Sequence, residues 1–302
     1  MFIIVLNQKN LVPDGLNSEL VHKFPNSVVF KDKYIAVSSI SMFYSWFNIL
    51  EVYNNNYFTY TWTAGATTTT YRVNIPDGLY EITDINNFIQ FTCIQNGTYW
   101  SIFGNNYYPF ELLVNANRYA VQLNTYLIPT ALPTDATVPT NFPGWPTVEQ
   151  NSVVSFPAQF NSIVGYTANF QSDPNLNNAY VPPLPSSQSQ NYVAKLAGGQ
   201  LSYLSNFAPQ VQPNSNVLIN ISNINNPYTI PSSVIYSLTP SVQIGEQITD
   251  TPPNFMWNRL IDGTYNELRV QLKGTDGQRL RINDPNMTIL LTIRDKFDIQ
   301  QQ

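Results

Sequence analysis

The sequence predicts a mainly β, antiparallel protein with a small α+β unit inserted in it. In the last third of the chain, Leu268, Val270 and Leu272 alternate with polar residues, the pattern of a strand with one face in a core and the other in water. Similar short runs, separated by turn residues, recur along most of the chain. Helical spacing of apolar residues is convincing at one place only, residues 83–93.

The last third is predicted to be a three-stranded meander. The strand over 268–272 is followed by Asp276-Gly277, a pair that accepts the positive φ angles of a tight hairpin turn. A second strand passes through residues 280–282 and stops at Asp284-Pro285, and a third covers 289–293. We expect these three strands to pair in sequence order.

The remaining elements follow from the same patterns. Thr83 is the expected N-cap of the helix, whose apolar positions include Ile85, Ile89 and Cys93. Prolines are dense over 129–185, so that segment is predicted to be mostly irregular and extended. Further short strands are expected at 20–24, 28–30, 34–40, 57–62, 71–75, 110–114, 118–123, 200–204, 216–221, 233–238 and 242–244.

These elements divide the chain into two parts. Only the middle segment, 57–185, changes from strand periodicity to helix periodicity, and it combines two hairpins, one helix and proline-rich loops. The outer segments, 1–56 and 186–302, contain strands alone. We therefore predict that the outer segments form one β-sandwich from which the middle segment projects as an insertion.

Composition excludes several classes of function. Of 302 residues, 43% are hydrophobic, enough for a large core, but only 11% are charged, against roughly 25% in ordinary soluble proteins. The net charge of −5 argues against broad binding of nucleic acid, although it leaves local contacts open. The single cysteine excludes an internal disulfide framework. No run is long enough to span a membrane, and the protein is expected to be made in the cytoplasm.

The charges are also unevenly distributed. Between Arg118 and Arg259 the only cation is Lys195, in a tract rich in Asn, Thr, Ser, Pro and Tyr. Monomers usually keep water-facing surfaces charged, so this neutral tract favours surface that is covered in an assembly. A neutral, hydrated loop region is the alternative interpretation.

No catalytic, cofactor-binding or metal-binding residue is predicted. His22 is the only histidine and reads as a strand residue, Cys93 lies on the apolar side of the helix, and Asp262 and Asp276 stand beside glycines as turn formers. A glycosidase would need a pair of carboxylates, and the scattered glutamates single out no pair: Glu51, Glu81, Glu111, Glu149, Glu246 and Glu267. Five tryptophans could line a sugar-binding groove but are more often core anchors: Trp46, Trp62, Trp100, Trp145 and Trp257.

A series of weak motifs, in order along most of the chain, resembles one family. They are Tyr71–Ile89 (YRVNIPDGLYEITDINNFI), Phe160–Tyr166 (FNSIVGY), Val217–Ile224 (VLINISNI), Leu268–Gly277 (LRVQLKGTDG) and Met287–Ile293 (MTILLTI). Together they are similar to the penton, or minor capsid, proteins of virophages and Polinton-type elements. Tyr166 departs from the family, which usually has Phe after this Gly, and a buried Tyr needs a hydrogen-bond partner.

The resemblance implies a fold and a role. It implies a jelly-roll capsid domain bearing an insertion, and a homopentamer that closes each fivefold vertex of a small icosahedral double-stranded DNA virus. It further implies hexamers of a double-jelly-roll major capsid protein as neighbours, a place in the virion, and no catalytic residues or cofactors. The alternative is a carbohydrate- or receptor-binding β-sandwich, such as a fibre or adhesin head, whose partner is a host receptor; an enzyme is a distant third.

Overall fold

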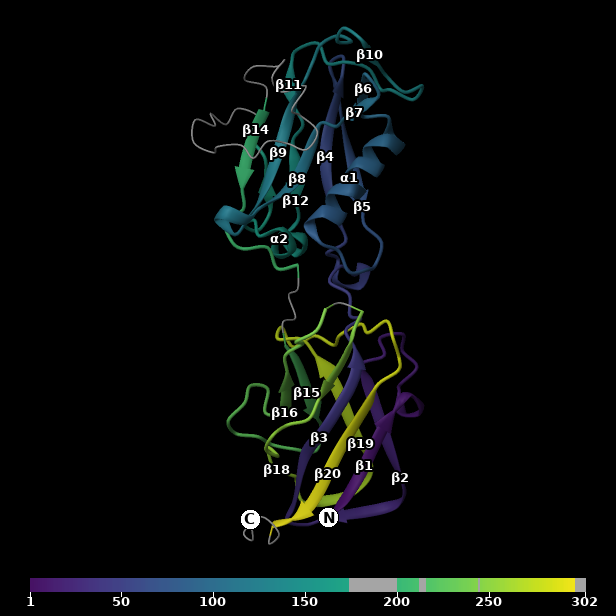
Figure 1. Ribbon diagram of the computed structural model, residues 1–302, viewed down its shortest axis with the longest axis vertical. Coiled ribbons are helices and arrows are strands. Elements are labelled where there is room, and N and C mark those ends of the chain that lie inside the picture. Colours follow the sequence, from purple (N-terminus) through teal and green to yellow (C-terminus); the bar gives the residue numbers. More distant parts are fainter. Residues whose placement is uncertain (174–199, 212–215, 244, 297–302) are drawn as a thin grey trace. The chain divides into compact units, whose positions relative to one another are not determined.

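The protein is described here by a computed structural model covering residues 1–302 except 174–199, 212–215, 244 and 297–302 (Figure 1). The chain forms two compact units. Unit 1 consists of Met1–Phe47 and Pro213–Gln302, and unit 2 is the intervening Asn48–Gln212. A middle segment therefore interrupts the outer one.

Unit 1 contains two antiparallel sheets. One has the order β1-β20-β3-β17, with the short β18 also paired to β3. The other has the order β16-β15-β19-β2. Their strands are β1 (Phe2–Asn7), β2 (Glu19–Phe30), β3 (Lys33–Phe43), β15 (Val217–Ile221), β16 (Val234–Leu238), β17 (Gln247–Asp250), β18 (Asn258–Arg259), β19 (Gly263–Lys273) and β20 (Thr288–Asp295).

The strand order makes unit 1 a jelly roll. If the two-residue β18 is set aside, the strands are eight, and in chain order one sheet reads first, eighth, third, sixth. The other reads second, seventh, fourth, fifth, so the chain passes repeatedly between the sheets. This arrangement is the double-sheet jelly roll. Unit 2 is inserted between the third strand, β3, and the fourth, β15.

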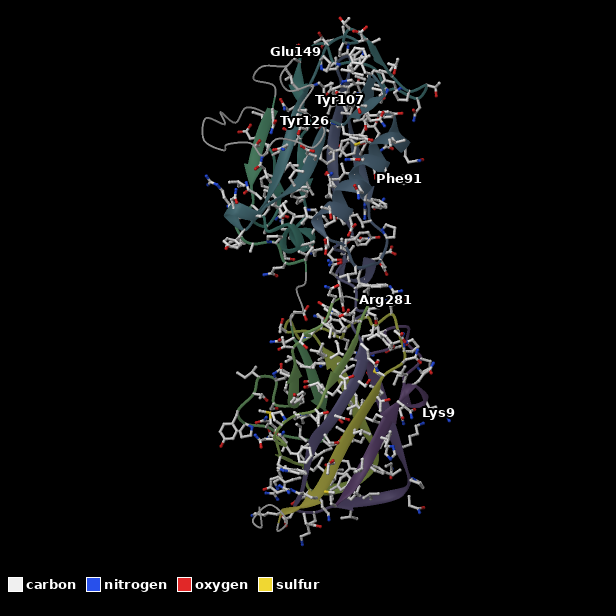
Figure 2. The ribbon with its side chains drawn as sticks, in the orientation of Figure 1. Lys9, Phe91, Tyr107, Tyr126, Glu149 and Arg281 are labelled. Atoms are coloured by element: carbon white, nitrogen blue, oxygen red, sulfur yellow. The ribbon has the colours of Figure 1, made fainter. Side chains whose placement is uncertain are left out.

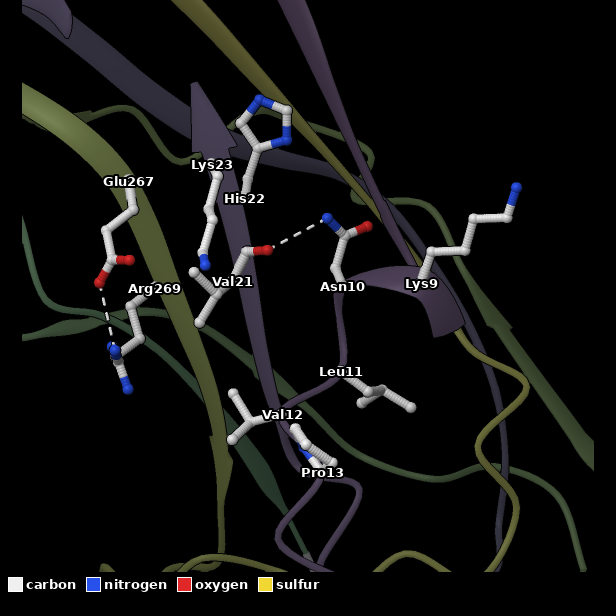
Figure 3. A pocket seen from close by; sticks show the side chains of 10 residues that line it. All are labelled: Lys9, Asn10, Leu11, Val12, Pro13, Val21, His22, Lys23, Glu267 and Arg269. Atoms are coloured by element: carbon white, nitrogen blue, oxygen red, sulfur yellow. Dashed lines mark hydrogen bonds and ion pairs between the residues drawn. The ribbon is translucent and has the colours of Figure 1, made fainter. Parts of the chain in front are cut away.

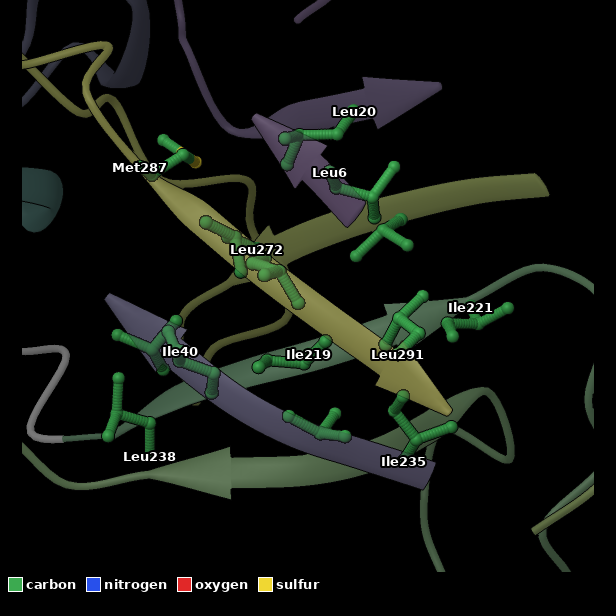
Figure 4. Close-up of a cluster of buried hydrophobic side chains, with 14 of the residues drawn as sticks. Leu6, Leu20, Ile40, Ile219, Ile221, Ile235, Leu238, Leu272, Met287 and Leu291 are labelled. Atoms are coloured by element: carbon green, nitrogen blue, oxygen red, sulfur yellow. The ribbon is translucent and has the colours of Figure 1, made fainter. Parts of the chain in front are cut away.

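The inner faces of the two sheets share one hydrophobic core (Figure 4). Leu6, Ile40 and Leu291 come from the first sheet, and Ile219 and Leu272 from the second. The alternating residues of the last third behave as predicted: Leu268, Val270, Leu272, Ile289 and Leu291 are all completely buried.

The predicted meander is wrong in its pairing. β19 pairs with β2 and β15, whereas β20 pairs with β1 and β3 in the opposite sheet. Leu280 and Ile282 are buried, but no second strand forms there: the segment has only isolated bridges, from Arg279 to Lys273 and from Ile282 to Trp46, and Leu280 N–H donates to the Leu272 carbonyl at 3.1 Å. The turn at Gly277 (φ +80°) is present, and after it the chain crosses the sandwich.

Unit 2 has its own sheets and its own cores. Four strands take the order β13-β12-β4-β5, three the order β10-β6-β7, and β9 is flanked by β8, β11 and β14. The elements are β4 (Tyr57–Ala64), β5 (Thr67–Asn74), α1 (Ile82–Asn96), β6 (Trp100–Ile102), β7 (Asn105–Tyr107), β8 (Phe110–Asn115), β9 (Ala120–Ile128), β10 (Ala136–Thr137), β11 (Gln150–Asn151), β12 (Val154–Phe156), α2 (Ala158–Val164), β13 (Phe170–Gln171) and β14 (Gln200–Leu204), and short 3-10 turns occur in the chain at Gln8–Asn10, Glu51–Tyr53 and Ala116–Arg118.

The predicted helix is α1, which packs on β8. Ile85, Ile89 and Cys93 are buried, and the Leu112 N–H of β8 donates to the Asn86 side chain at 2.9 Å. The helix begins earlier than predicted, because the buried Ile82 already belongs to it; its N-cap is Glu81, not Thr83. The Glu81 N–H donates to the Asp84 carboxylate at 2.9 Å, which satisfies one free amide of the first turn. Phe91, on the solvent side, is exposed (Figure 2).

The boundaries of the insertion differ from the expected 57–185. The unit begins earlier, at Asn48, because Ile49 bridges to Gly78 within it. It ends later, at Gln212, because β14, expected in the sandwich, pairs along its whole length with β9. Much of 129–173 is irregular with short strands, as the prolines predict, but Ala158–Val164 forms the helix α2.

Candidate functional surfaces

The two residues best able to act as base and nucleophile occupy packed positions in different units. His22 lies half-buried on β2 and contacts the Phe24 ring edge-on, with centroids 5.0 Å apart. Cys93 is completely buried in unit 2, and burial raises the pKa of its thiol to about 12. A thiol with a raised pKa is protonated at neutral pH and is a poor nucleophile.

The aspartates beside glycine act in turns, as predicted. The Asp276 carboxylate accepts a hydrogen bond from the Gln278 N–H at 2.9 Å, and this bond spans Gly277, whose φ is positive. Asp262 accepts the Asp32 N–H at 3.0 Å and pairs with Arg259 at 2.9 Å, and these contacts lower the pKa of its carboxyl group. Both groups stabilise connections between strands.

One of the scattered glutamates is completely buried. Glu111 on β8 accepts hydrogen bonds from the Asn124 amide (3.2 Å) and the Tyr126 hydroxyl, both on β9. The side-chain oxygen Oδ1 of Asn124 in turn accepts hydrogen bonds from the Gln122 amide and the Ser202 hydroxyl, each at 2.8 Å. Because Val121 and Leu123 on the same strand enter the apolar core, β9 has an apolar face and a buried polar one. The side chains of the polar face form one connected hydrogen-bond network, and these bonds offset the free-energy cost of removing the polar groups from water.

A second buried carboxylate, Glu19 of β2, is not indicated by the sequence patterns. It pairs with Arg269, accepts from the Gln271 amide at 2.9 Å, and lies 3.2 Å from Arg279. Arg279 also pairs with Asp14 at 2.6 Å. The partners of Glu19 lie more than 200 positions away in the sequence, and a local sequence pattern cannot relate residues that are so far apart. Among the described residues, no group of three or more His, Cys, Asp or Glu side chains could hold a metal ion.

The tryptophans are mainly core residues. Trp46, Trp62 and Trp100 are 3%, 1% and 0% exposed, so they cannot line an open groove. Trp145 is half-buried against Trp100 (5.7 Å between ring centroids), and Trp257 stacks under the Arg294 guanidinium at 3.8 Å. Sugar-binding sites need aromatic rings that a ligand can reach, so this arrangement favours anchoring of the fold.

Tyr166, which departs from the family pattern, has the partners that a buried Tyr requires. Its hydroxyl donates to the Tyr203 carbonyl at 2.7 Å and accepts the Leu123 N–H at 2.9 Å. It therefore joins the end of α2 to β9 and β14. Burial raises the pKa of this hydroxyl well above its usual range, so it stays protonated.

A hollow of the described surface lies on unit 1, beside β2 and β19 (Figure 3). Its volume is about 700 Å³, and Lys9, Lys23 and Arg269 surround an apolar floor that includes Val12 and Val21. Arg269 is held by Glu267 at 3.1 Å, and Lys9 extends away from the others. The hollow thus lies on the outer face of a sheet, and its lining has three cationic side chains, Lys9, Lys23 and Arg269, against the single carboxylate of Glu267.

The two outer faces of the jelly roll differ in charge. The β2–β19 face presents Lys23, Glu267, Arg269 and Lys273. The face of the β1-β20-β3-β17 sheet has no charged residue over 2–7, 34–43, 247–249 or 288–293. On β1, Ile3 and Val5 are 57% and 48% exposed, whereas Ile4 and Leu6 enter the core. One side of the sandwich is therefore suited to water, and the other exposes apolar and neutral groups.

No protein-family model and no curated protein matches the chain. Among solved structures, the chain is similar to the mavirus penton protein, with 10% identity, 97% of each chain covered and a TM-score of 0.39. It is also similar to a chain in the structure of the Sputnik virophage, with 10% identity, 99% of each chain covered and a TM-score of 0.36. The jelly-roll assignment rests on the strand order of unit 1, not on these alignments. No helix in the described part of the chain is long and apolar enough to cross a membrane.

Proposed function

We propose that this chain is a structural virion protein: the penton capsomer that closes the fivefold vertices of a small icosahedral double-stranded DNA virus. The observation that carries the proposal is the eight-stranded jelly roll of unit 1, interrupted between its third and fourth strands by unit 2. Jelly rolls are frequent in viral capsids but also occur in lectins, so the fold alone does not decide. The ordered motifs that resemble virophage and Polinton-type penton proteins favour the capsid.

The mechanism is assembly and not catalysis. Five identical subunits close a ring when each presents two different complementary patches related by a rotation of one fifth of a turn. The outer face of the β1-β20-β3-β17 sheet is uncharged over most of its length, so its burial requires little desolvation of charge. The hexamers of a double-jelly-roll major capsid protein then surround the ring as its second partner.

The lectin or receptor-binding alternative has less support. Three of the five tryptophans are buried, and a hollow of about 390 Å³ in unit 2 is lined by threonine, amide and aliphatic side chains with Glu149 and no aromatic ring. A glycan array separates the two functions, because a lectin binds specific glycans without any coat protein.

The decisive experiment is coexpression with the double-jelly-roll major capsid protein of the same virus. We expect complete particles with filled vertices when this chain is present, and particles with open vertices when it is omitted. Electron microscopy with fivefold averaging reads out the difference. Filled vertices in its absence exclude the penton role.

A further inference from the structure

The β1 edge of the jelly roll lacks the features that normally protect a sheet edge. β1 pairs with β20 on one side and ends the sheet on the other. Its six residues have no charge and no proline, and their register with β20 contains no bulge. Natural edge strands usually carry a charged residue, a proline or a bulge, because an exposed regular edge can pair with a strand of another chain. With Ile3 and Val5 exposed beside it, this edge is suited to being covered.

A second apolar surface projects from the loop between β15 and β16. Tyr228 and Ile230 are 94% and 101% exposed, the most exposed large apolar side chains of the described residues. Such exposure is unusual unless the side chains contact another molecule.

The loop that presents them is held by its own hydrogen bonds. Asn226 N–H donates to the Ser232 carbonyl at 2.6 Å, and the Asn226 side chain accepts the Tyr228 N–H at 3.1 Å. The Asn226 amide also donates to the Val234 carbonyl at 3.2 Å, at the start of β16. An anchor that is already ordered loses less entropy when it binds.

The two surfaces lie on opposite lateral sides of unit 1. β1 packs beside β2, the edge of the other sheet. At the far side, β16 is joined to β17 by the Tyr236 hydroxyl, which donates to the Asp250 carboxylate at 2.6 Å. β17 stands at the opposite end of the sheet order from β1, and Figure 1 shows β16 on the left of this unit and β1 and β2 on the right. One copy therefore cannot join its own two surfaces.

We propose that the β15–β16 loop tip (Tyr228 and Ile230) of one copy packs against the β1 face and edge (Ile3 and Val5) of the next copy. This inference rests on the proposed function and identifies its ring contact. The occupant is a second copy because this chain itself offers the complement: both surfaces are apolar and uncharged, and one is an exposed loop tip whereas the other is a regular edge strand. Since they lie on opposite sides, the contact is head-to-tail, the kind that closes into a ring.

Cross-linking between engineered cysteines tests the contact. The native Cys93 is completely buried and does not compete for the reagent in the folded protein. Wild-type ring formation, alone or with the major capsid protein, is first established by electron microscopy. The Ile3→Cys and Ile230→Cys proteins are then assembled separately and as an equal mixture, and treated with a short bismaleimide.

Covalent dimers are expected in the mixture and not in either variant alone, and the variant with both cysteines is expected to give a ladder that ends at the closed ring. Cross-linking of Ile3→Cys to itself indicates a twofold β1–β1 contact and overturns the proposal. Rings without any cross-link in the mixture also overturn it, while leaving the penton function intact. Absence of wild-type rings and of filled vertices removes the proposed function, and this contact with it.

A charge-insertion pair gives an independent readout. The double variant Tyr228→Asp/Ile230→Asp is expected to weaken ring formation by about tenfold or more, because a buried carboxylate without a partner is strongly disfavoured. The fold should survive, since both side chains are exposed. Val148→Asp, at a 72% exposed position of unit 2, is the matched control and should assemble normally. Equal assembly of the double variant and wild type by analytical ultracentrifugation contradicts the proposal.

Discussion

Gly165, at the end of α2, permits a close backbone contact that no other residue allows. Its φ is +78°, and a Cβ built on it would lie 2.2 Å from the Phe207 carbonyl oxygen. Gly104 has almost the same φ, +79°, but nothing lies within 4 Å of the corresponding Cβ. The two glycines therefore form a matched pair in which only the surrounding space differs.

The cost of Gly165→Ala can be worked out from these contacts. An alanine at positive φ costs about 1–2 kcal/mol at either glycine. At Gly165 the chain must also move by 3.4 − 2.2 = 1.2 Å to restore an ordinary contact with Phe207. That movement breaks the bond from Phe207 N–H to the Gly165 carbonyl (2.9 Å) and weakens the one from Ser205 to the Phe207 carbonyl (2.8 Å). At about 1 kcal/mol for the broken bond and up to about 1 kcal/mol for the weakened one, the total is about 2–4 kcal/mol for Gly165→Ala against about 1–2 for Gly104→Ala.

Cys93 provides the assay. It is the only cysteine, it is completely buried, and it belongs to the same core as Val164, which precedes Gly165. The rate of thiol labelling in increasing urea therefore reports the opening of unit 2 in the intact chain. We expect the labelling midpoint of Gly165→Ala to fall well below that of Gly104→Ala. Midpoints that agree within error for the two variants refute the close approach to Phe207.

Three further predictions concern stability, measured by circular dichroism in urea. Tyr166→Phe should destabilise unit 2 by about 1–3 kcal/mol, because the buried Leu123 N–H and Tyr203 carbonyl lose the hydroxyl group that they bond. An unchanged urea midpoint contradicts this. Leu272→Ala should cost about 2–5 kcal/mol in unit 1, against a small change for the exposed Val29→Ala, and a loss under about 0.5 kcal/mol shows that β19 does not pack as described. Burial raises the pKa of Cys93 from about 9 in the unfolded chain to about 12 in the folded protein. The protonated thiol therefore contributes fully to the free energy of unfolding below pH 9. That contribution declines by about 1.4 kcal/mol per pH unit as pH rises from 9 towards 12. Cys93→Ala should therefore lose less stability than wild type between pH 9 and 10.5, and equal losses contradict the assignment.

The neutral tract between Arg118 and Arg259 extends over both units. It includes β9 and β14 of unit 2 as well as β15 to β18 of unit 1, and residues 174–199 within it lie outside the described part of the chain. Its burial in an assembly stays a prediction. The tract does contain the exposed Tyr228 and Ile230, so the cross-linking experiment tests a part of it.

Local periodicity was enough to place many apolar side chains in the core. Alternation places Leu272 and Leu291 in the core, and helical spacing does the same for Ile85 and Cys93, because both periods follow from backbone geometry alone. The absence of a second cysteine, the low charge and the turn roles of Asp262 and Asp276 also follow from residue types. The residue pattern therefore determined the β class and the helix α1, whereas the second helix of the insertion, α2, lies in the proline-rich segment that the pattern predicts to be irregular.

Pairing was decided by the tertiary structure. An apolar strand face can be covered by any other apolar face, so alternation does not say that β20 joins β1 and β3 instead of β19. The same holds for β14, whose pattern fits either unit and whose place is decided by β9. Glu19 and Arg269 meet across 250 positions of sequence, a separation that no local rule spans. Strand pairing and buried ion pairs depend on contacts between residues far apart in the sequence, and these contacts form only when the whole sandwich closes over its core.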